Sequence, residues 1–112
     1  MTMDRVQTIE QRKQARVEEI RVGFGRLCGE LAAYGRAHGG KFWVYGSAAA
    51  GQLHFDSDID ILVDFDDAQI VDALDFAETA CVRLKLKPDA QPKSWCSAAF
   101  LDRISSQALV LP

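Results

Sequence analysis

The segment from Ile59 to Phe65 constrains the fold more than any other part of the chain. It reads Ile-Asp-Ile-Leu-Val-Asp-Phe, a short apolar run in which acidic residues enter at every second or fourth place. This pattern predicts a β-strand with a buried face. Side chains alternate between the two faces of a strand, so Asp58, at the mouth of the strand, and Asp60 point the same way, while the apolar residues between them point into the core.

The rest of the chain predicts helices alternating with strands. An amphipathic stripe over 3–36 indicates a long first helix that His38-Gly39-Gly40 ends. The stripe consists of Val17, Ile20, Phe24, Leu27, Leu31 and Tyr34. The elements that follow are a strand over 41–45, a short helix over 46–51, the strand over 59–65, a helix over 70–80, a strand over 82–87 and a helix over 97–109.

Local signals predict where these later elements begin and end. Asp66 or Asp67 is expected to cap the helix over 70–80, and Ser97 to cap the last helix. Pro88 and Pro92 are expected to close the third strand.

The order of elements predicts one small domain. Strands that alternate with helices indicate an α/β (α+β) fold with a small mixed sheet of about three or four strands flanked by helices. A chain of 112 residues leaves no room for a second core of normal size. We therefore expect a single domain over 1–112, with an N-terminal helix over 1–38 and the core over 41–112.

Charge and composition exclude several classes of protein. With 13 Lys and Arg against 16 Asp and Glu the net charge is −3, so the chain is not a polybasic nucleic-acid or membrane binder. No apolar run approaches the roughly 20 residues of a bilayer span, and the amino terminus lacks the apolar region of a secretion signal. Cys28, Cys81 and Cys96 are widely spaced and fit reduced thiols. We expect a cytoplasmic protein.

The acidic strand predicts a metal site. Two carboxylates on one strand face repel each other, and a divalent cation such as Mg²⁺ or Mn²⁺ relieves that repulsion with hard oxygen ligands. Asp56 and Asp64 share the parity of Asp58 and Asp60, so parity alone does not choose the pair. Adjacency, and the place of Asp58 at the mouth of the strand, favour Asp58 and Asp60.

A phosphate seat is predicted just upstream. Gly46 and Ser47 stand where a strand ends and a helix begins, a place that offers backbone N–H groups, a positive dipole end and a hydroxyl. Ser57-Asp58-Ile59-Asp60 begins ten residues after Ser47. A single strand-turn-helix-strand unit would therefore present a phosphate seat and a carboxylate pair to the same cleft.

These residues resemble a known signature. Gly46-Ser47-x-x-x-Gly51 followed by Ser57-Asp58-x-Asp60 is similar to the GS…DxD motif of the nucleotidyltransferase (DNA polymerase beta-like) superfamily. The small size resembles its minimal branch, the MNT or MntA-like proteins, and would make 41–112 the catalytic core. The resemblance implies metal-dependent NMP transfer, with Asp58 and Asp60 on the ions, Gly46 and Ser47 on the β- and γ-phosphates, and Ser57 beside the nucleotide.

The resemblance also implies a third metal-binding acid on a neighbouring strand. Asp89 is our candidate, because it follows the predicted third strand where the family would place it. A turn residue between two prolines is the other reading of Asp89. Asp64 is the alternative on the acidic strand, but its Cα would lie roughly 13 Å from that of Asp60 at ~3.3 Å per residue, which is too far to share an ion.

The chain departs from the family pattern at one point. Many relatives carry an arginine shortly after Gly-Ser, whereas this chain has Ala48-Ala49-Ala50. The candidates to supply the missing charge are Lys41, Lys85, Lys87 and Lys93, or a partner protein. The remaining alternative is poor nucleotide binding.

Three functions follow as expectations. The resemblance implies an antitoxin that transfers AMP from ATP to a protein hydroxyl on a small helical HEPN-type toxin, without direct contact to nucleic acid or membrane. A second hypothesis is a binding antitoxin that masks its partner without catalysis, and a third is a structural metal-binding domain. The sequence leaves open whether the chain forms homo- or hetero-oligomers.

Overall fold

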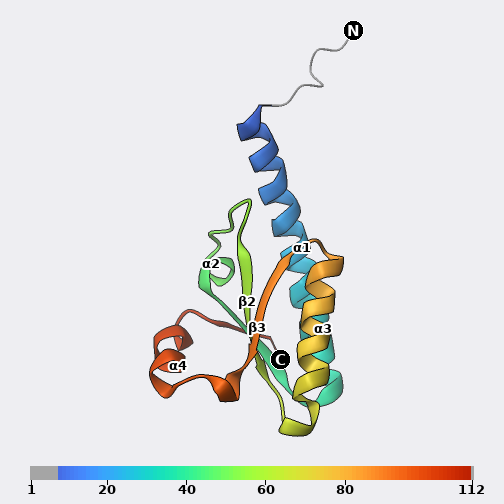
Figure 1. Ribbon diagram of the computed structural model, residues 1–112, viewed down its shortest axis with the longest axis vertical. Coiled ribbons are helices and arrows are strands. Elements are labelled where there is room, and N and C mark those ends of the chain that lie inside the picture. The colour runs from blue at the N-terminus through green and yellow to red at the C-terminus, as the bar shows by residue number, and fades with distance from the viewer. Residues whose placement is uncertain (1–7, 112) are drawn as a thin grey trace.

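The computed structural model describes residues 8–111 (Figure 1). The predicted start of the first helix at Met3 lies outside the described residues. The elements in chain order are α1 (Ile9–His38), β1 (Lys41–Tyr45), α2 (Gly46–Ala49), β2 (Asp58–Asp64), η2 (Asp67–Gln69), α3 (Ile70–Arg83), β3 (Lys87–Pro92), η3 (Lys93–Trp95), α4 (Ala98–Ser105) and β4 (Leu109–Leu111). No helix among residues 8–111 has the length and apolar character that a membrane span requires.

Helix α1 has a defined cap at each end. The Thr8 hydroxyl accepts from the backbone N–H of Gln11, and the Gln11 side chain accepts from the Thr8 N–H, which is a capping box. Gly39 ends the helix in the left-handed conformation at φ 74°. Between the caps, the predicted stripe buries Ile20, Leu27 and Leu31. The 30 residues make a rod of about 45 Å, and its first turns project beyond the sheet (Figure 1).

The four strands form one mixed sheet in the order β3-β2-β1-β4. Strands β2 and β3 are parallel, whereas β1 is antiparallel to both β2 and β4. Within this register Asp60 of β2 lies between Tyr45 of β1 and Asp89 of β3. This architecture confirms the α/β fold class with a long N-terminal helix.

The two faces of the sheet differ in character. Ile59, Ile61 and Val63 of β2 are fully buried and join the core with residues of α1 and α3. Figure 1 shows these two helices together on one side of the sheet, with α2 and α4 on the other side. The face of β2 that α1 and α3 leave uncovered carries Asp58 and Asp60, as the alternation predicts.

The third strand is not where the sequence analysis places it. Residues 82–87 were expected to be a strand, but α3 continues to Arg83, and a turn with Lys85 at φ 62° leads to β3. The alternation of apolar and basic residues there belongs to a helix end and a turn, in which Leu86 is buried.

The two prolines lie inside the strand that they were expected to close. Pro88 and Pro92 belong to β3 and pair with β2. Proline lacks an N–H, but an edge strand bonds on one side only and therefore tolerates it.

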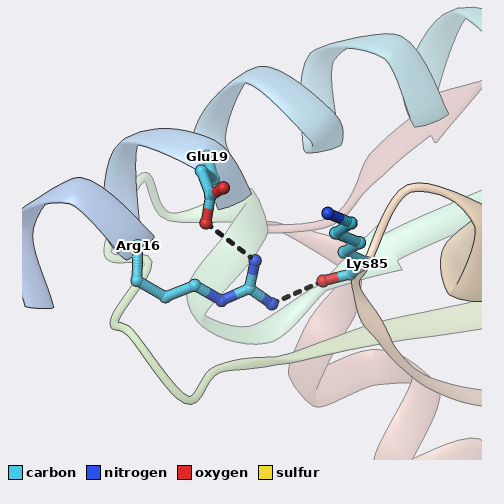
Figure 2. A network of polar contacts seen from close by, with 3 residues as sticks. All are labelled: Arg16, Glu19 and Lys85. Carbon is cyan, nitrogen blue, oxygen red and sulfur yellow. Dashed lines mark hydrogen bonds and ion pairs between the residues drawn. The ribbon is translucent and has the colours of Figure 1, made fainter. Parts of the chain in front are cut away.

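The turn before β3 is tied to α1. The Arg16 guanidinium donates to the backbone carbonyl of Lys85 and forms an ion pair with Glu19 at 3.4 Å (Figure 2). An added Cβ on Gly23 of α1 would lie 3.2 Å from the carbonyl oxygen of Leu84, so helix and turn pack closely. These contacts hold the start of β3 against the long helix.

The C-terminal region also differs from the sequence analysis. Ser97 caps α4 as expected, because its hydroxyl accepts from the Phe100 N–H at 3.1 Å. The helix ends at Ser105, however, and Leu109 begins β4, which pairs with β1 and supplies the fourth strand. Asp66 precedes the short η2 turn without a side-chain cap, so the predicted acidic cap of α3 was wrong.

Candidate active site

Three carboxylates meet on the open face of the sheet. Asp60 on β2 is the register partner of Asp89 on β3, and Asp58 precedes Asp60 by two residues on the same face. The Asp60 carboxyl lies close enough to Asp89 for charge and hydrogen bonding between the two to raise its pKa. The structure therefore brings together the three acids that the sequence analysis named, although Asp89 lies in the middle of a strand and not at its end.

Burial and the neighbouring acids together raise the pKa of Asp60 from 3.8 to about 6. Partial burial is the largest cause, followed by the negative charge of Asp89, the hydrogen bond to Asp89 and the negative charge of Asp58. Two carboxyl groups can share a hydrogen bond only when one of them holds a proton. Below about pH 6, where Asp60 holds a proton, its carboxyl group can therefore donate to Asp89.

The donor set fits a hard divalent cation. Asp58, Asp60 and Asp89 offer only carboxylate oxygens, which Mg²⁺ and Mn²⁺ prefer. No group of three or more His, Cys, Asp or Glu among residues 8–111 is arranged to hold a metal ion as it stands. A cation held by these oxygens would offset the negative charges of Asp89 and Asp58, which add to the effect of burial in raising the pKa of Asp60.

Glycine is required at position 46 for two reasons. Gly46 has φ 73°, in the left-handed region that residues with a Cβ rarely adopt. A Cβ added there would lie 2.3 Å from Oδ2 of Asp60. The turn from β1 into α2 thus packs directly against the acid, so the predicted phosphate seat and the predicted metal ligands lie side by side.

Ser47 and Ser57 occupy different settings. Ser47 lies in the first turn of α2, half-buried, and its hydroxyl forms no hydrogen bond with any residue from 8 to 111. The Ser57 hydroxyl accepts from the backbone N–H of His54 at 2.6 Å, and the Ser57 N–H donates to the His54 carbonyl at 3.2 Å. Ser57 therefore closes the turn that leads into β2. Contact of either serine with a nucleotide stays a prediction.

Two residues beside the acids were missed by the sequence analysis. The Gln91 side-chain amide donates to the hydroxyl of Tyr45 at 3.3 Å, which links the edge strand β3 to β1 across β2. Burial raises the pKa of Tyr45, the hydrogen bond from Gln91 lowers it, and the negative charges of Asp60 and Asp89 raise it further. Assigning the third strand to 87–92 would have found Gln91, two positions from Asp89 on the same face.

A large hollow lies away from the acids. It measures about 580 Å³ and is lined by residues of α1 and by the turn after α3, including Arg16, Arg26, Arg83 and Lys85. This is the region that Arg16 ties to the turn (Figure 2). None of the three carboxylates lines it.

Comparison with known proteins identifies the family. A family model described as a nucleotidyltransferase domain matches residues 28–101, about two thirds of the chain, from the middle of α1 into α4. The matched region contains the three acids, Gly46 and Ser47. Searches of curated proteins and of solved structures find no match. The chain belongs to the nucleotidyltransferase domain family.

Proposed function

We propose that this chain transfers AMP from ATP to a hydroxyl group of a partner protein, with Mg²⁺ or Mn²⁺ bound by Asp58, Asp60 and Asp89. The observation that carries the proposal is the row of three carboxylates with the Gly46 turn packed against the central acid. The domain family supports nucleotidyl transfer in general. The minimal-branch resemblance of the Gly46-Ser47 and Asp58-x-Asp60 motifs supports the finer assignment.

The chain's own residues divide the work of the reaction. Bound divalent ions would supply positive charge against the phosphates. Gly46 leaves the turn open beside Asp60, and Ser47 offers a free hydroxyl to the phosphate chain. In the transfer the acceptor oxygen bonds to the α-phosphorus, the bond from that phosphorus to the bridging oxygen breaks, and pyrophosphate leaves. The acceptor proton passes to a carboxylate of the row, with Asp89 on the outer strand as our choice.

The biological role that we propose is that of an antitoxin. The partner is a small helical protein of the HEPN type, modified by this chain in the cytoplasm. Within residues 8–111 the strands form a single four-stranded sheet with its helices, which favours recognition of the acceptor through an associated protein.

A binding antitoxin without catalysis is the second candidate. Helix α2 reads Gly-Ser-Ala-Ala and carries no cation to hold a phosphate, which favours masking of the partner over turnover. The three acids argue against this candidate, because a binding protein has no need of a partly buried carboxylate, Asp60, placed next to the carboxylates of Asp58 and Asp89.

The test is transfer of label from α-³²P-ATP, with Mg²⁺ or Mn²⁺, to a co-purified partner. We expect labelling by the wild-type protein and none by the double variant Asp58→Asn/Asp60→Asn. Asp75→Asn controls for the loss of an acid outside the site, because Asp75 is exposed on α3, which lies on the opposite side of the sheet. A stable complex without label from any nucleotide would refute the enzyme and support the binding antitoxin.

A further inference from the structure

The structure distinguishes between the four lysines that could replace the missing arginine. Lys85 faces the hollow between α1 and the turn after α3. The Lys93 ammonium lies 3.8 Å from Oδ2 of Asp64 and 5.0 Å from the ring centroid of Trp43, so it already has partners. Lys41 begins β1, opposite Asp64, and lies four residues before Tyr45, about 13 Å along the strand.

Lys87 occupies a different position, next to the acid row. It is the register partner of Asp58 on the adjacent strand, and it precedes Asp89 by two residues. Strand alternation places Lys87 and Asp89 on the same face, where Asp89 lies beside its register partner Asp60. Lys87 is exposed, and it forms no ion pair or hydrogen bond with any residue between 8 and 111.

We infer that Lys87 binds the α-phosphate of the nucleotide. The inference rests on the proposed function and names a substrate contact within it. The Gly46-Ser47 turn follows β1 and Lys87 begins β3, so they flank the acids of β2 from opposite sides, roughly 10 Å apart at ~4.8 Å per strand. If the γ-phosphate lies at the Gly46-Ser47 turn, the triphosphate crosses the acids of β2, and the α-phosphate comes nearest to β3.

A lysine suits this position chemically. The α-phosphate gains negative charge as the bond to pyrophosphate breaks, and an ammonium group with three donors stabilises that charge. The flexible side chain of a lysine spans the distance between neighbouring strands. Lys87 thereby supplies, from the opposite side of the three acids, the positive charge that α2 lacks.

The test measures binding of Mg·ATP to the full chain by calorimetry, separately from turnover. We expect Lys87→Ala to weaken binding about tenfold and Lys87→Arg to restore most of it, because a charged contact to phosphate is lost and regained. We expect AMP binding to fall by a similar factor, since AMP keeps the α-phosphate. Lys41→Ala, an exposed lysine at the far end of the same sheet, is the matched control and should bind as the wild type does.

A second readout separates a lost contact from a disturbed site. Mn²⁺ binding, followed by electron paramagnetic resonance, depends on the acids and should survive in Lys87→Ala, whereas Asp58→Asn should lose it. Wild-type affinity for both nucleotides in Lys87→Ala would overturn the inference and leave the proposed function standing. Parallel loss of Mn²⁺ and ATP would overturn it as well, and absence of nucleotide binding by the wild type would overturn both.

Discussion

Replacing Asp60 by asparagine should stabilise the folded chain at neutral pH. The pKa of Asp60 is raised from 3.8 to about 6, first by partial burial and then by its acidic neighbours. At pH 7.5 the folded protein must hold this carboxylate ionised against those forces, whereas the unfolded chain holds it freely in water. Asparagine keeps the shape and the hydrogen-bonding capacity of the side chain. It has no negative charge for burial and the neighbouring acids to disfavour.

The sign of the pH dependence follows from proton binding. Between pH 3.8 and about 6 the folded state holds a proton on Asp60 that the unfolded state has released. Stability contributed by Asp60 is therefore fully present below pH 3.8 and is lost as the pH rises through about 6. The advantage of Asp60→Asn over the wild type should grow across that interval and level off above pH 7.

The magnitude follows from the pKa shift and the exposure. A difference of about two units corresponds to at most about 3 kcal/mol. Asp60 is only partly buried, and solvent screens its interactions, so we expect about 1 kcal/mol. For a chain of this length that is roughly 4 °C in Tm.

The assay is urea unfolding of both proteins at pH 4 and pH 7.5 without divalent cations. Asp67→Asn, an exposed acid at the start of η2, controls for the loss of one charge. Added Mg²⁺ should raise the Tm of the wild type at pH 7.5 and leave that of Asp60→Asn nearly unchanged, because the variant lacks a ligand. An Asp60→Asn protein that is less stable than the wild type at pH 7.5 would refute the reasoning.

Three further predictions concern single positions. Gly46→Ala should destabilise the chain by about 2–3 kcal/mol in urea unfolding. Gly51→Ala should lose only about 1 kcal/mol, because Gly51 also has a positive φ, of 72°, but nothing lies within 4 Å of its added Cβ. Equal losses would mean that the close approach of Gly46 to Asp60 is unimportant for stability. Tyr45→Phe removes the hydroxyl that accepts from the Gln91 amide and should lower the stability of the chain by about 1 kcal/mol in urea unfolding. Unchanged stability would mean that this hydrogen bond does not form in solution. Cys81 is fully buried, and its pKa is raised to about 12 by burial first and by the charge of Glu78 second. It should therefore react with a thiol reagent only after unfolding. Rapid labelling of Cys81 in the native protein would contradict its place in the core.

Sequence patterns were sufficient where one local rule dominates. The stripe of α1 and the alternation in β2 each report a face that packs into the core, and the predicted end of α1 and both ends of β2 lie within two residues of those observed. The fully buried Leu62, on the same face of β2 as Asp58 and Asp60, is the exception to the alternation. The strand-turn-helix unit at Gly46 follows from glycine and alanine chemistry alone. These elements carry four of the named site residues: Gly46, Ser47, Asp58 and Asp60.

Patterns failed where tertiary pairing overrides local preference. The helix end at 82–83 and the turn at Lys85 imitate a strand, because a helix end followed by a turn also alternates apolar and basic side chains. Leu109 fits a helical stripe, but its backbone pairs with Val44 of β1, a contact far away in the sequence. The direct pairing of Asp89 with Asp60 is of the same kind and could not be derived from spacing.

The prolines of β3 connect the fold to the proposed chemistry. An edge strand with free N–H groups invites another strand to pair with it, and Pro88 and Pro92 remove two of these donors. The outer edge of β3 is thereby protected against strand addition, next to Lys87 and Asp89. In the proposed reaction, an acceptor that approaches from the outer edge of β3 would reach Asp89 and the α-phosphate bound by Lys87, where the new bond would form. The residues that most misled the sequence analysis therefore help to keep the open side of the proposed site open.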